Sequence, residues 1–227
     1  DHFMPRINRI DVGDVIYHVI NRANARMQIF NKDEDYILFE KVIEEAKEKF
    51  DMRILSYEIM PNHWHLILYP RKDGDLQKFM GWVSMTHTQR WHSRHKTIGS
   101  GHLYQGRYKS FPIERNRYLL QLFRYVERNA LRAKLVKKAE DWKWSSLYRR
   151  EKGNINQKKL LSKWPIDMPD DYIKLVNEVQ TNKEIESLRY SVNKGKPYGS
   201  DNWTNKMIDK FNLKATLRNP GRPNKGS

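Results

Sequence analysis

The stretch RILSYEIMPNHWHLILYP, residues 53–70, decides the fold that this sequence predicts. Two runs rich in aliphatic and aromatic residues, 54–60 and 63–69, flank Pro61-Asn62. Such runs are typical of β-strands, and the Pro-Asn pair indicates a turn or bulge between them. Side chains alternate across a strand, so His63 and His65 share one face and Trp64 takes the other. Two histidines on one sheet face can hold a divalent cation, which makes this pair the first candidate for a functional site.

The composition favours a polyanionic partner. The 227 residues carry 43 Lys and Arg against 27 Asp and Glu, a net charge of +16, and 12% are aromatic. Positive charge with aromatic rings suits a surface that neutralises phosphates and stacks bases. No apolar run approaches the roughly 20 residues that span a bilayer, so nucleic acid is the expected partner and a membrane is not. The absence of cysteine excludes disulfides, thiolate zinc sites and cysteine nucleophiles, and it is consistent with the expected cytoplasmic location.

The remaining elements extend this hairpin into a complete domain. Hydrophobic periodicity predicts strands over 15–21 and 107–113. It predicts helices over 33–49, 75–95 and 115–136. Residues 31–33 offer caps for the first of these helices. The resulting order is that of a ferredoxin-like βαββαβ fold of the α+β class, with an antiparallel sheet and the last helix available to cover one face. His18 falls in the first strand, where a third metal ligand is one interpretation. We expect an ordinary strand histidine, because nothing in the sequence places His18 near His63 and His65.

The sequence changes character near residue 150. Residues 1–150 are expected to form the ferredoxin-like domain, and 151–227 a helical C-terminal extension with a basic tail. Within the extension, 153–163 is polar and linker-like, 170–190 is weakly helical, and 203–213 predicts a short helix.

A basic span is the second functional signal. Between Leu76 and Ile113 there is no acidic residue, which is typical of a surface that faces phosphates. A histidine pair in this span, His92 and His95, is expected to make surface contacts rather than a metal site. The residues expected to contact DNA are Arg90, Arg94, Lys96, Arg107, Lys109, Arg128, Arg132 and Arg222.

The histidine pair needs a third ligand and an open position to act as a catalytic metal site. Mg²⁺ and Mn²⁺ work on phosphates and prefer oxygen, which Asn129 in the third predicted helix can supply. Tyr125 lies one turn earlier on the same helix face. If this helix packs on the strand of the histidines, the tyrosine oxygen can attack phosphorus and form a covalent phosphotyrosine. Arg128 or Arg132 would favour the phenolate.

Four segments together resemble a known family. They are MPNHWHLIL (60–68), GHLYQGRYKS (101–110), RYVERNALRA (124–133) and WKWSS (142–146). This set is similar to the REP-associated tyrosine transposases, which are single-tyrosine HUH enzymes of the transposase IS200-like superfamily. The likeness covers residues 12–150 closely and continues more loosely into 198–203 and 221–223.

The resemblance implies a mechanism and a substrate. It implies that Tyr125 is the nucleophile and that His63, His65 and Asn129 bind Mg²⁺ or Mn²⁺. The implied substrate is a single-stranded DNA hairpin from a repetitive extragenic palindrome, with a short recognition tetranucleotide at its 5′ foot. Cleavage would leave a 5′-phosphotyrosine and a 3′-hydroxyl. A monomer is expected, with a dimer as the alternative.

One feature departs from the family pattern, and the tail resembles a second motif. Relatives commonly have Asn-Pro-Val where this chain has Asn129-Ala130-Leu131, and the loss of proline predicts a straighter helix that keeps the ligand position. Residues 220–223 resemble part of an AT-hook, a minor-groove motif, without its preceding arginine.

Other interpretations stay open at this point. Taken singly, Tyr125 fits a half-buried helix tyrosine with a hydrogen-bonded hydroxyl, and Asn129 fits a solvent-facing amide. His63 and His65 fit a cross-strand packing pair. The four residues together favour function. The alternative function is a non-catalytic protein that binds hairpin DNA or RNA, which has no need of a tyrosine facing a histidine pair. A hydrolytic nuclease is the third possibility, and few residues could serve as the base for its water.

Overall fold

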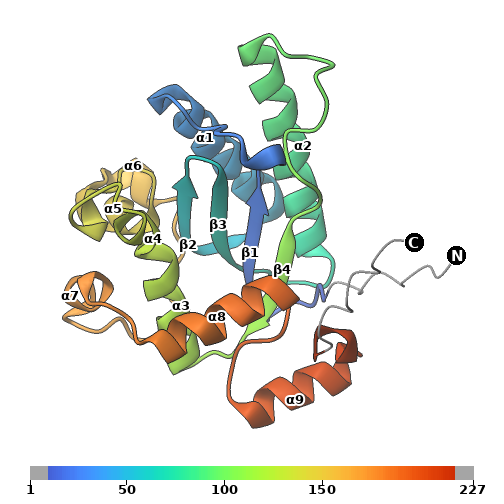
Figure 1. Ribbon diagram of the computed structural model, residues 1–227, viewed down its shortest axis with the longest axis vertical. Coiled ribbons are helices and arrows are strands. Elements are labelled where there is room, and N and C mark those ends of the chain that lie inside the picture. Colours follow the sequence, from blue (N-terminus) through green and yellow to red (C-terminus); the bar gives the residue numbers. More distant parts are fainter. Residues whose placement is uncertain (1–9, 218–227) are drawn as a thin grey trace, which may run out of the picture.

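A computed structural model describes residues 10–217, and its centre is one four-stranded antiparallel sheet (Figure 1). The strands are β1 (Ile16–Arg22), β2 (Arg53–Met60), β3 (His63–Tyr69) and β4 (Lys109–Ile113). Their spatial order is β2-β3-β1-β4, so the two strands of the opening sequence stretch are neighbours and β1 lies between β3 and β4. This arrangement confirms the predicted ferredoxin-like α+β fold.

The hairpin between β2 and β3 is as tight as its sequence indicated. Met60 faces His63 across the pair, which leaves only Pro61 and Asn62 in the turn. The carbonyl oxygen of Pro61 accepts hydrogen bonds from the backbone N–H groups of Ile29 and Phe30, so the turn is also tied to the loop before the first helix.

Two helices cover one face of the sheet. These are α1 (Asp33–Phe50) and α2 (Asp75–His95), and they enclose a core with Trp64, Leu66 and Leu68 of β3. The predicted capping residues at 31–33 do not cap α1 with their side chains. Instead the Asp35 carboxylate accepts the N–H groups of Asn31 and Lys32 at 3.0 and 3.1 Å, which satisfies donors that the first helical turn cannot pair.

The opposite face carries α3 (Arg117–Glu127) and the short α4 (Asn129–Arg132). The expected single helix over 115–136 is therefore wrong: the helix breaks at Arg128, whose φ is −97° and ψ is 1°. The expectation of a straighter helix without proline is wrong for the same reason. Ala130, unlike proline, retains a backbone N–H. That N–H donates to Glu58 Oε1 at 2.7 Å instead of to a backbone carbonyl of the preceding helical turn.

The C-terminal segment is built of short helices, and part of it packs on the α3 side of the sheet (Figure 1). Its helices are α5 (Ser146–Lys152), α6 (Ile155–Lys158), α7 (Tyr172–Asn177), α8 (Asn182–Lys194) and α9 (Asp201–Lys210). Short 3₁₀ turns occur at Asn24–Arg26, Ala139–Asp141 and Lys214–Leu217. Tyr172 and Leu188 join the core around α3.

The stretch 153–163 is more than the linker that its polarity suggested. It contains α6, Leu160 is buried, and the N–H of Ser162 donates to the carbonyl of Ile54 at 2.8 Å. Ile59 donates to the carbonyl of Trp144 at 2.9 Å, and the Trp164 indole donates to the carbonyl of Leu55 at 2.9 Å. The outer edge of β2 is thereby covered by its own chain.

Candidate active site

The histidine pair of β3 faces the tyrosine helix. Side-chain alternation sends Trp64 into the core under α1 and α2, and leaves His63 and His65 on the α3 side, with ring centroids 5.1 Å apart. Burial, with smaller contributions from Arg22 and Arg132, lowers the pKa of His63 to about 4. Burial lowers the pKa of His65 well below its usual range. Both rings are therefore neutral near pH 7, the form in which imidazole binds a metal ion.

His18 of β1 belongs to the same cluster, contrary to the sequence-based expectation. Its Nε2 lies 2.8 Å from Nδ1 of His65, and the two rings are stacked. Burial lowers the pKa of His18 to about 3. The pairing follows from the register, since His65 opposes Ile20 and His18 is two residues away on the same face. The ferredoxin-like strand order puts β1 beside β3, and that order was the signal in the sequence that could have placed His18 here.

Tyr125 lies directly above this cluster. Its side chain is on α3, only 7% of the residue is exposed, and its ring stands edge-on to His65 with centroids 6.3 Å apart. The guanidinium carbon of Arg132 lies 4.4 Å from the centre of the same ring. The structure thus brings together the histidine pair and Tyr125, which follows His65 by 60 residues in the sequence.

Asn129 is held at the break between α3 and α4. Its Oδ1 accepts a hydrogen bond from Nη2 of Arg132 at 2.6 Å. The neighbouring N–H of Ala130 donates to Glu58, which stands opposite His65 on β2. This contact fixes the start of α4 on the sheet, next to the histidine pair.

Glu58 is a site residue that sequence reasoning missed. It is fully buried, and its second oxygen, Oε2, has no hydrogen-bond partner within residues 10–217. Burial raises the pKa of this carboxyl well above its usual range. The sequence showed that Glu58 lies in a predicted strand. It did not show that Ala130, just after the break between α3 and α4, is its hydrogen-bond partner.

The donors of this cluster suit a divalent cation. No group of three or more His, Cys, Asp or Glu side chains gathers into a metal site in the part of the chain that the structure describes. The available set is two neutral imidazoles and the amide oxygen of Asn129, with the unpartnered Oε2 of Glu58 on the neighbouring strand. Nitrogen and oxygen donors of this kind are compatible with Mn²⁺, and the oxygens with Mg²⁺.

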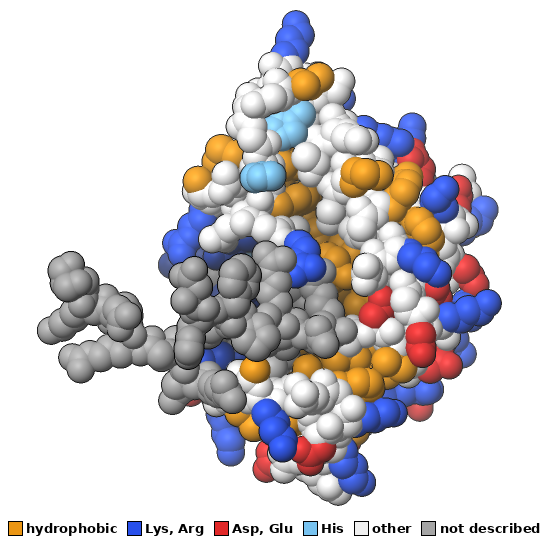
Figure 2. All heavy atoms as spheres, turned by 90° about the vertical axis from the view of Figure 1, so that its right-hand side faces the viewer, with side chains coloured by type: hydrophobic (Ala, Val, Ile, Leu, Met, Phe, Trp, Pro, Cys, Tyr) orange, Lys and Arg blue, Asp and Glu red, His pale blue; other side chains and the backbone are white. Residues whose placement is uncertain are grey.

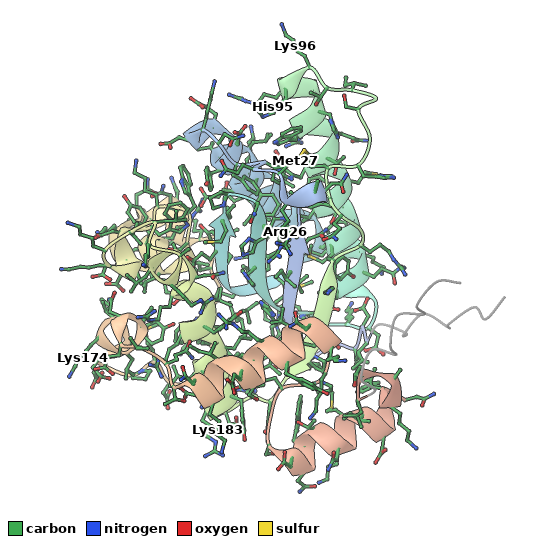
Figure 3. The ribbon with its side chains drawn as sticks, viewed as in Figure 1. Arg26, Met27, His95, Lys96, Lys174 and Lys183 are labelled. Carbon is green, nitrogen blue, oxygen red and sulfur yellow. The ribbon has the colours of Figure 1, made fainter. Side chains whose placement is uncertain are left out.

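The expected DNA contacts fall into different environments. Arg107 and Lys109 are exposed beside β1, and Arg94 and Lys96 are exposed at the far end of α2, where Lys96 points away from the molecule (Figure 3). On the face shown in Figure 2, acidic side chains gather toward the right and lower edges, away from the exposed histidines. Arg222 lies outside the described residues.

Three of the expected arginines already have protein partners. Arg90 forms a two-pronged ion pair with Glu45 at 3.0 and 2.7 Å. Arg128 donates to the backbone oxygens of Glu178 and Asn177, before α8, and Arg132 is engaged at the site as described above. Their availability to DNA stays a prediction.

Comparison with known proteins agrees with this fold. The model of the transposase IS200-like family matches residues 11–129, more than half of the chain, and the protein belongs to this family. It is accordingly a transposase-family protein of the DNA-cleaving class. No curated protein matches the sequence.

Several solved structures are similar, among them these two. One is a REP-associated tyrosine transposase bound to a REP hairpin, with a TM-score of 0.54 and 20% identity over 74% of this chain and 94% of that chain. At this identity the likeness shows the fold. The second is a transposase candidate from Deinococcus radiodurans R1, with a TM-score of 0.40 and 19% identity over 54% of this chain and 96% of that chain. No helix within residues 10–217 is long and apolar enough to cross a membrane.

Proposed function

We propose that this protein is a cation-dependent single-stranded DNA endonuclease and strand transferase that cuts at hairpins of the repetitive extragenic palindrome type through Tyr125. The observation that carries the proposal is the position of Tyr125, edge-on to His65 and beneath the guanidinium of Arg132. A tyrosine placed between two imidazoles and a half-buried arginine has the surroundings that an attack on a phosphodiester requires.

In the proposed reaction, Tyr125 gives its phenolic proton to water and its oxygen bonds to phosphorus. The bond between phosphorus and the 3′ oxygen of the preceding nucleotide breaks, and that oxygen takes up a proton. The products are a 3′-hydroxyl and a 5′-phosphotyrosine, which stores the bond energy for rejoining. Arg132 contributes positive charge beside the phenolate and the phosphate, because its guanidinium carbon lies 4.4 Å from the centre of the Tyr125 ring.

His63, His65 and Asn129 would hold the divalent cation, Mg²⁺ or Mn²⁺. When bound, it would polarise a non-bridging oxygen of the scissile phosphate. The amide oxygen of Asn129 accepts one hydrogen bond from Arg132, which leaves a second lone pair for a cation.

Several observations support hairpin DNA as the substrate and a single chain as the working unit. The net charge of +16 and the acid-free span 76–113 suit a polyanion. The similar REP-associated transposase is bound to a REP hairpin, which supports a hairpin here. Because Tyr125 meets the histidines of its own chain, a monomer is sufficient for cleavage in this proposal. We also propose residues 1–150 as the catalytic unit and 151–227 as its extension.

Hairpin oligonucleotides labelled at the 5′ or the 3′ end, incubated with protein and Mn²⁺ and run on denaturing gels, test the proposal. The wild-type protein should retain the 3′ label covalently, and Tyr125→Phe and His63→Ala should not. Tyr118→Phe removes a hydroxyl from the same helix and is the matched control that should retain activity. Cleavage that survives Tyr125→Phe would indicate a hydrolytic nuclease. Tight binding without a cut across a panel of hairpins would indicate the non-catalytic binding protein.

A further inference from the structure

The ring of His63, the first residue of the histidine pair, is hydrogen-bonded to its neighbour in the chain. Its Nδ1 lies 2.6 Å from the side-chain oxygen of Asn62, in the tight turn between β2 and β3. An amide oxygen can only accept, so the hydrogen of the neutral ring is on Nδ1. Nε2 then carries the lone pair, and no hydrogen bond engages it within residues 10–217. Asn62 thus selects the tautomer whose unprotonated nitrogen can bind a cation.

This selection depends on which end of the Asn62 amide faces His63. If the amide were turned end for end, its NH₂ group would donate to Nδ1 and the hydrogen of the ring would be on Nε2. A contact on the other side of the amide distinguishes the two orientations. The amide nitrogen lies 3.4 Å from the backbone oxygen of Arg26, which accepts from an NH₂ group and would repel an amide oxygen. The Arg26 carbonyl therefore favours the orientation that leaves Nε2 of His63 available.

Arg26 belongs to a strained turn. The turn, Asn24–Arg26, follows β1, and Arg26 is labelled in Figure 3. Ala25 and Arg26 both have left-handed backbone conformations, with φ of 49° and 58°. Residues of these types rarely adopt such a conformation, and it persists only where the surrounding structure imposes it. Backbone strain of this kind is concentrated at functional sites, which directs attention to what the turn holds.

Backbone hydrogen bonds impose this conformation on the turn. The N–H of Ala23, just before it, donates to the carbonyl of Asn62 at 2.9 Å. The N–H of Asn24 donates to the carbonyl of Leu103 at 2.9 Å. None of the three side chains of the turn is buried, so the packing of a core does not account for its strain. The turn is instead fixed by its main chain to the residue whose amide it orients.

We propose that Asn62 is a positioning residue for His63, and that the strained turn Asn24–Arg26 holds the Asn62 amide in the orientation that makes Nε2 of His63 a cation ligand. Asn62 touches neither the cation nor DNA in this proposal and acts through the imidazole. The proposal rests on the proposed function, because the tautomer of His63 matters to the reaction only if a cation binds there. Metal-binding histidines generally donate their other ring N–H to a fixed acceptor, which orients the ring and strengthens binding.

The test reads the tautomer of His63 in the metal-free protein, by two-dimensional ¹H–¹⁵N correlation of the histidine ring nitrogens above neutral pH. Asn62→Leu replaces the amide with an apolar group of similar size, and Asn62→Asp keeps an acceptor oxygen. Asn205→Leu makes the same exchange at an exposed position of α9 and is the matched control. The wild type, Asn62→Asp and Asn205→Leu should hold the hydrogen on Nδ1. Asn62→Leu should lose this preference and bind Mn²⁺ about tenfold more weakly, as measured by electron paramagnetic resonance.

Two variants of Ala25 test the contribution of the turn. Ala25 is exposed, so its substitution acts on the backbone rather than on packing. Ala25→Gly suits a left-handed conformation and should leave the tautomer of His63 and the Mn²⁺ affinity as in the wild type. Ala25→Val disfavours that conformation, because a β-branched side chain is crowded there, and should reproduce the effects of Asn62→Leu.

The outcomes separate this proposal from the proposed function, because neither readout needs DNA. A wild-type tautomer in Asn62→Leu would overturn the role of Asn62, as would a folded Asn62→Asp with the hydrogen on Nε2. A change in Asn62→Leu together with a wild-type tautomer in Ala25→Val would overturn the role of the turn. Tautomers and Mn²⁺ affinities as expected, but no covalent product with any hairpin, would support the role of Asn62 and contradict the transferase.

Discussion

The Nε2 atom of His18 lies 2.8 Å from the Nδ1 atom of His65, and both rings are neutral. One of these nitrogens must carry the hydrogen. If His65 donates from Nδ1, its Nε2 keeps a free lone pair and can bind a cation; if His18 donates, it cannot. A ligand histidine that donates its other N–H to a buried partner is the usual arrangement in metal sites. His18 is thus suited to orient His65 from the neighbouring strand.

We therefore predict that His18→Phe weakens Mn²⁺ binding by about 10- to 100-fold, because it keeps a ring but removes the acceptor. His18→Gln can present an acceptor near the same place and should lose much less. Free Mn²⁺ measured by electron paramagnetic resonance would give the affinities, with His102→Phe as a control for loss of an exposed imidazole. Equal affinities of His18→Phe and the wild type would contradict this role.

A second prediction concerns the bond between Glu58 and Ala130. Glu58→Val should leave the buried N–H of Ala130 without an acceptor, at a cost of about 1–3 kcal/mol in the free energy of unfolding relative to Glu58→Gln. Ala130→Pro removes that donor, so Glu58→Val should cost less in its background. Urea denaturation of the four combinations of Glu58→Val and Ala130→Pro measures the coupling. Additive effects would show that the hydrogen bond does not fix α4.

Arg132 gives a third prediction. Its guanidinium bonds to Asn129 and covers the ring of Tyr125, so Arg132→Met should reduce the single-turnover rate of cleavage by roughly 10²- to 10³-fold. Arg132→Lys keeps the charge but cannot make both contacts. Its cleavage rate should lie between those of the wild type and Arg132→Met. The affinity for a hairpin without a single-stranded extension, measured by fluorescence anisotropy, should change far less. A loss of binding as large as the loss of rate would instead assign Arg132 to substrate affinity.

The fourth prediction is a pH dependence of stability at a site remote from catalysis. His87 lies on the buried face of α2 and contacts Phe39 of α1, and burial lowers its pKa to about 3. Its Nδ1 lies 2.6 Å from the Tyr104 hydroxyl, which already accepts the indole N–H of Trp64 and so donates to His87. The neutral ring is therefore the form that the fold selects.

The sign follows from linkage. Below a pH of about 6.5 the unfolded chain protonates this histidine and the folded protein does not, so stability falls as pH decreases from 6.5 toward 3. His87→Gln removes this contribution and should flatten the slope by up to about 1.4 kcal/mol per pH unit. Urea titrations at several pH values would measure it. A slope identical to that of the wild type would mean that the fold does not lower the pKa of His87.

Local sequence patterns predicted most of the fold, because strands and helices are determined largely by residues close together in the chain. Alternation in 53–70 placed His63 and His65 on one face, and the order of elements gave the antiparallel sheet with a helix on each side. The i, i+4 spacing of Tyr125 and Asn129 predicted that both lie on one helix face. In the structure Tyr125 lies on α3 and Asn129 on α4, because the helix breaks between them.

What the sequence could not predict depends on contacts between distant segments. His18 joins the cluster only through the register of β1 against β3. The break at Arg128 depends on Glu58, 70 residues earlier, whose carboxylate takes the N–H of Ala130. The engagement of Arg128 by backbone oxygens before α8 likewise requires the C-terminal segment to be folded onto α3.

The cover on the outer edge of β2 has a consequence for how this protein can be dissected. A free edge strand offers unpaired N–H and carbonyl groups that recruit strands from other molecules. Here Trp144, Ser162 and Trp164 occupy those groups on residues 54–59. A chain shortened to residues 1–150 would keep the contact from Trp144 and lose the other two, leaving an apolar strand partly open. Such a fragment should aggregate during expression, which makes the segment beyond 150 a safeguard of solubility as well as a neighbour of the catalytic face.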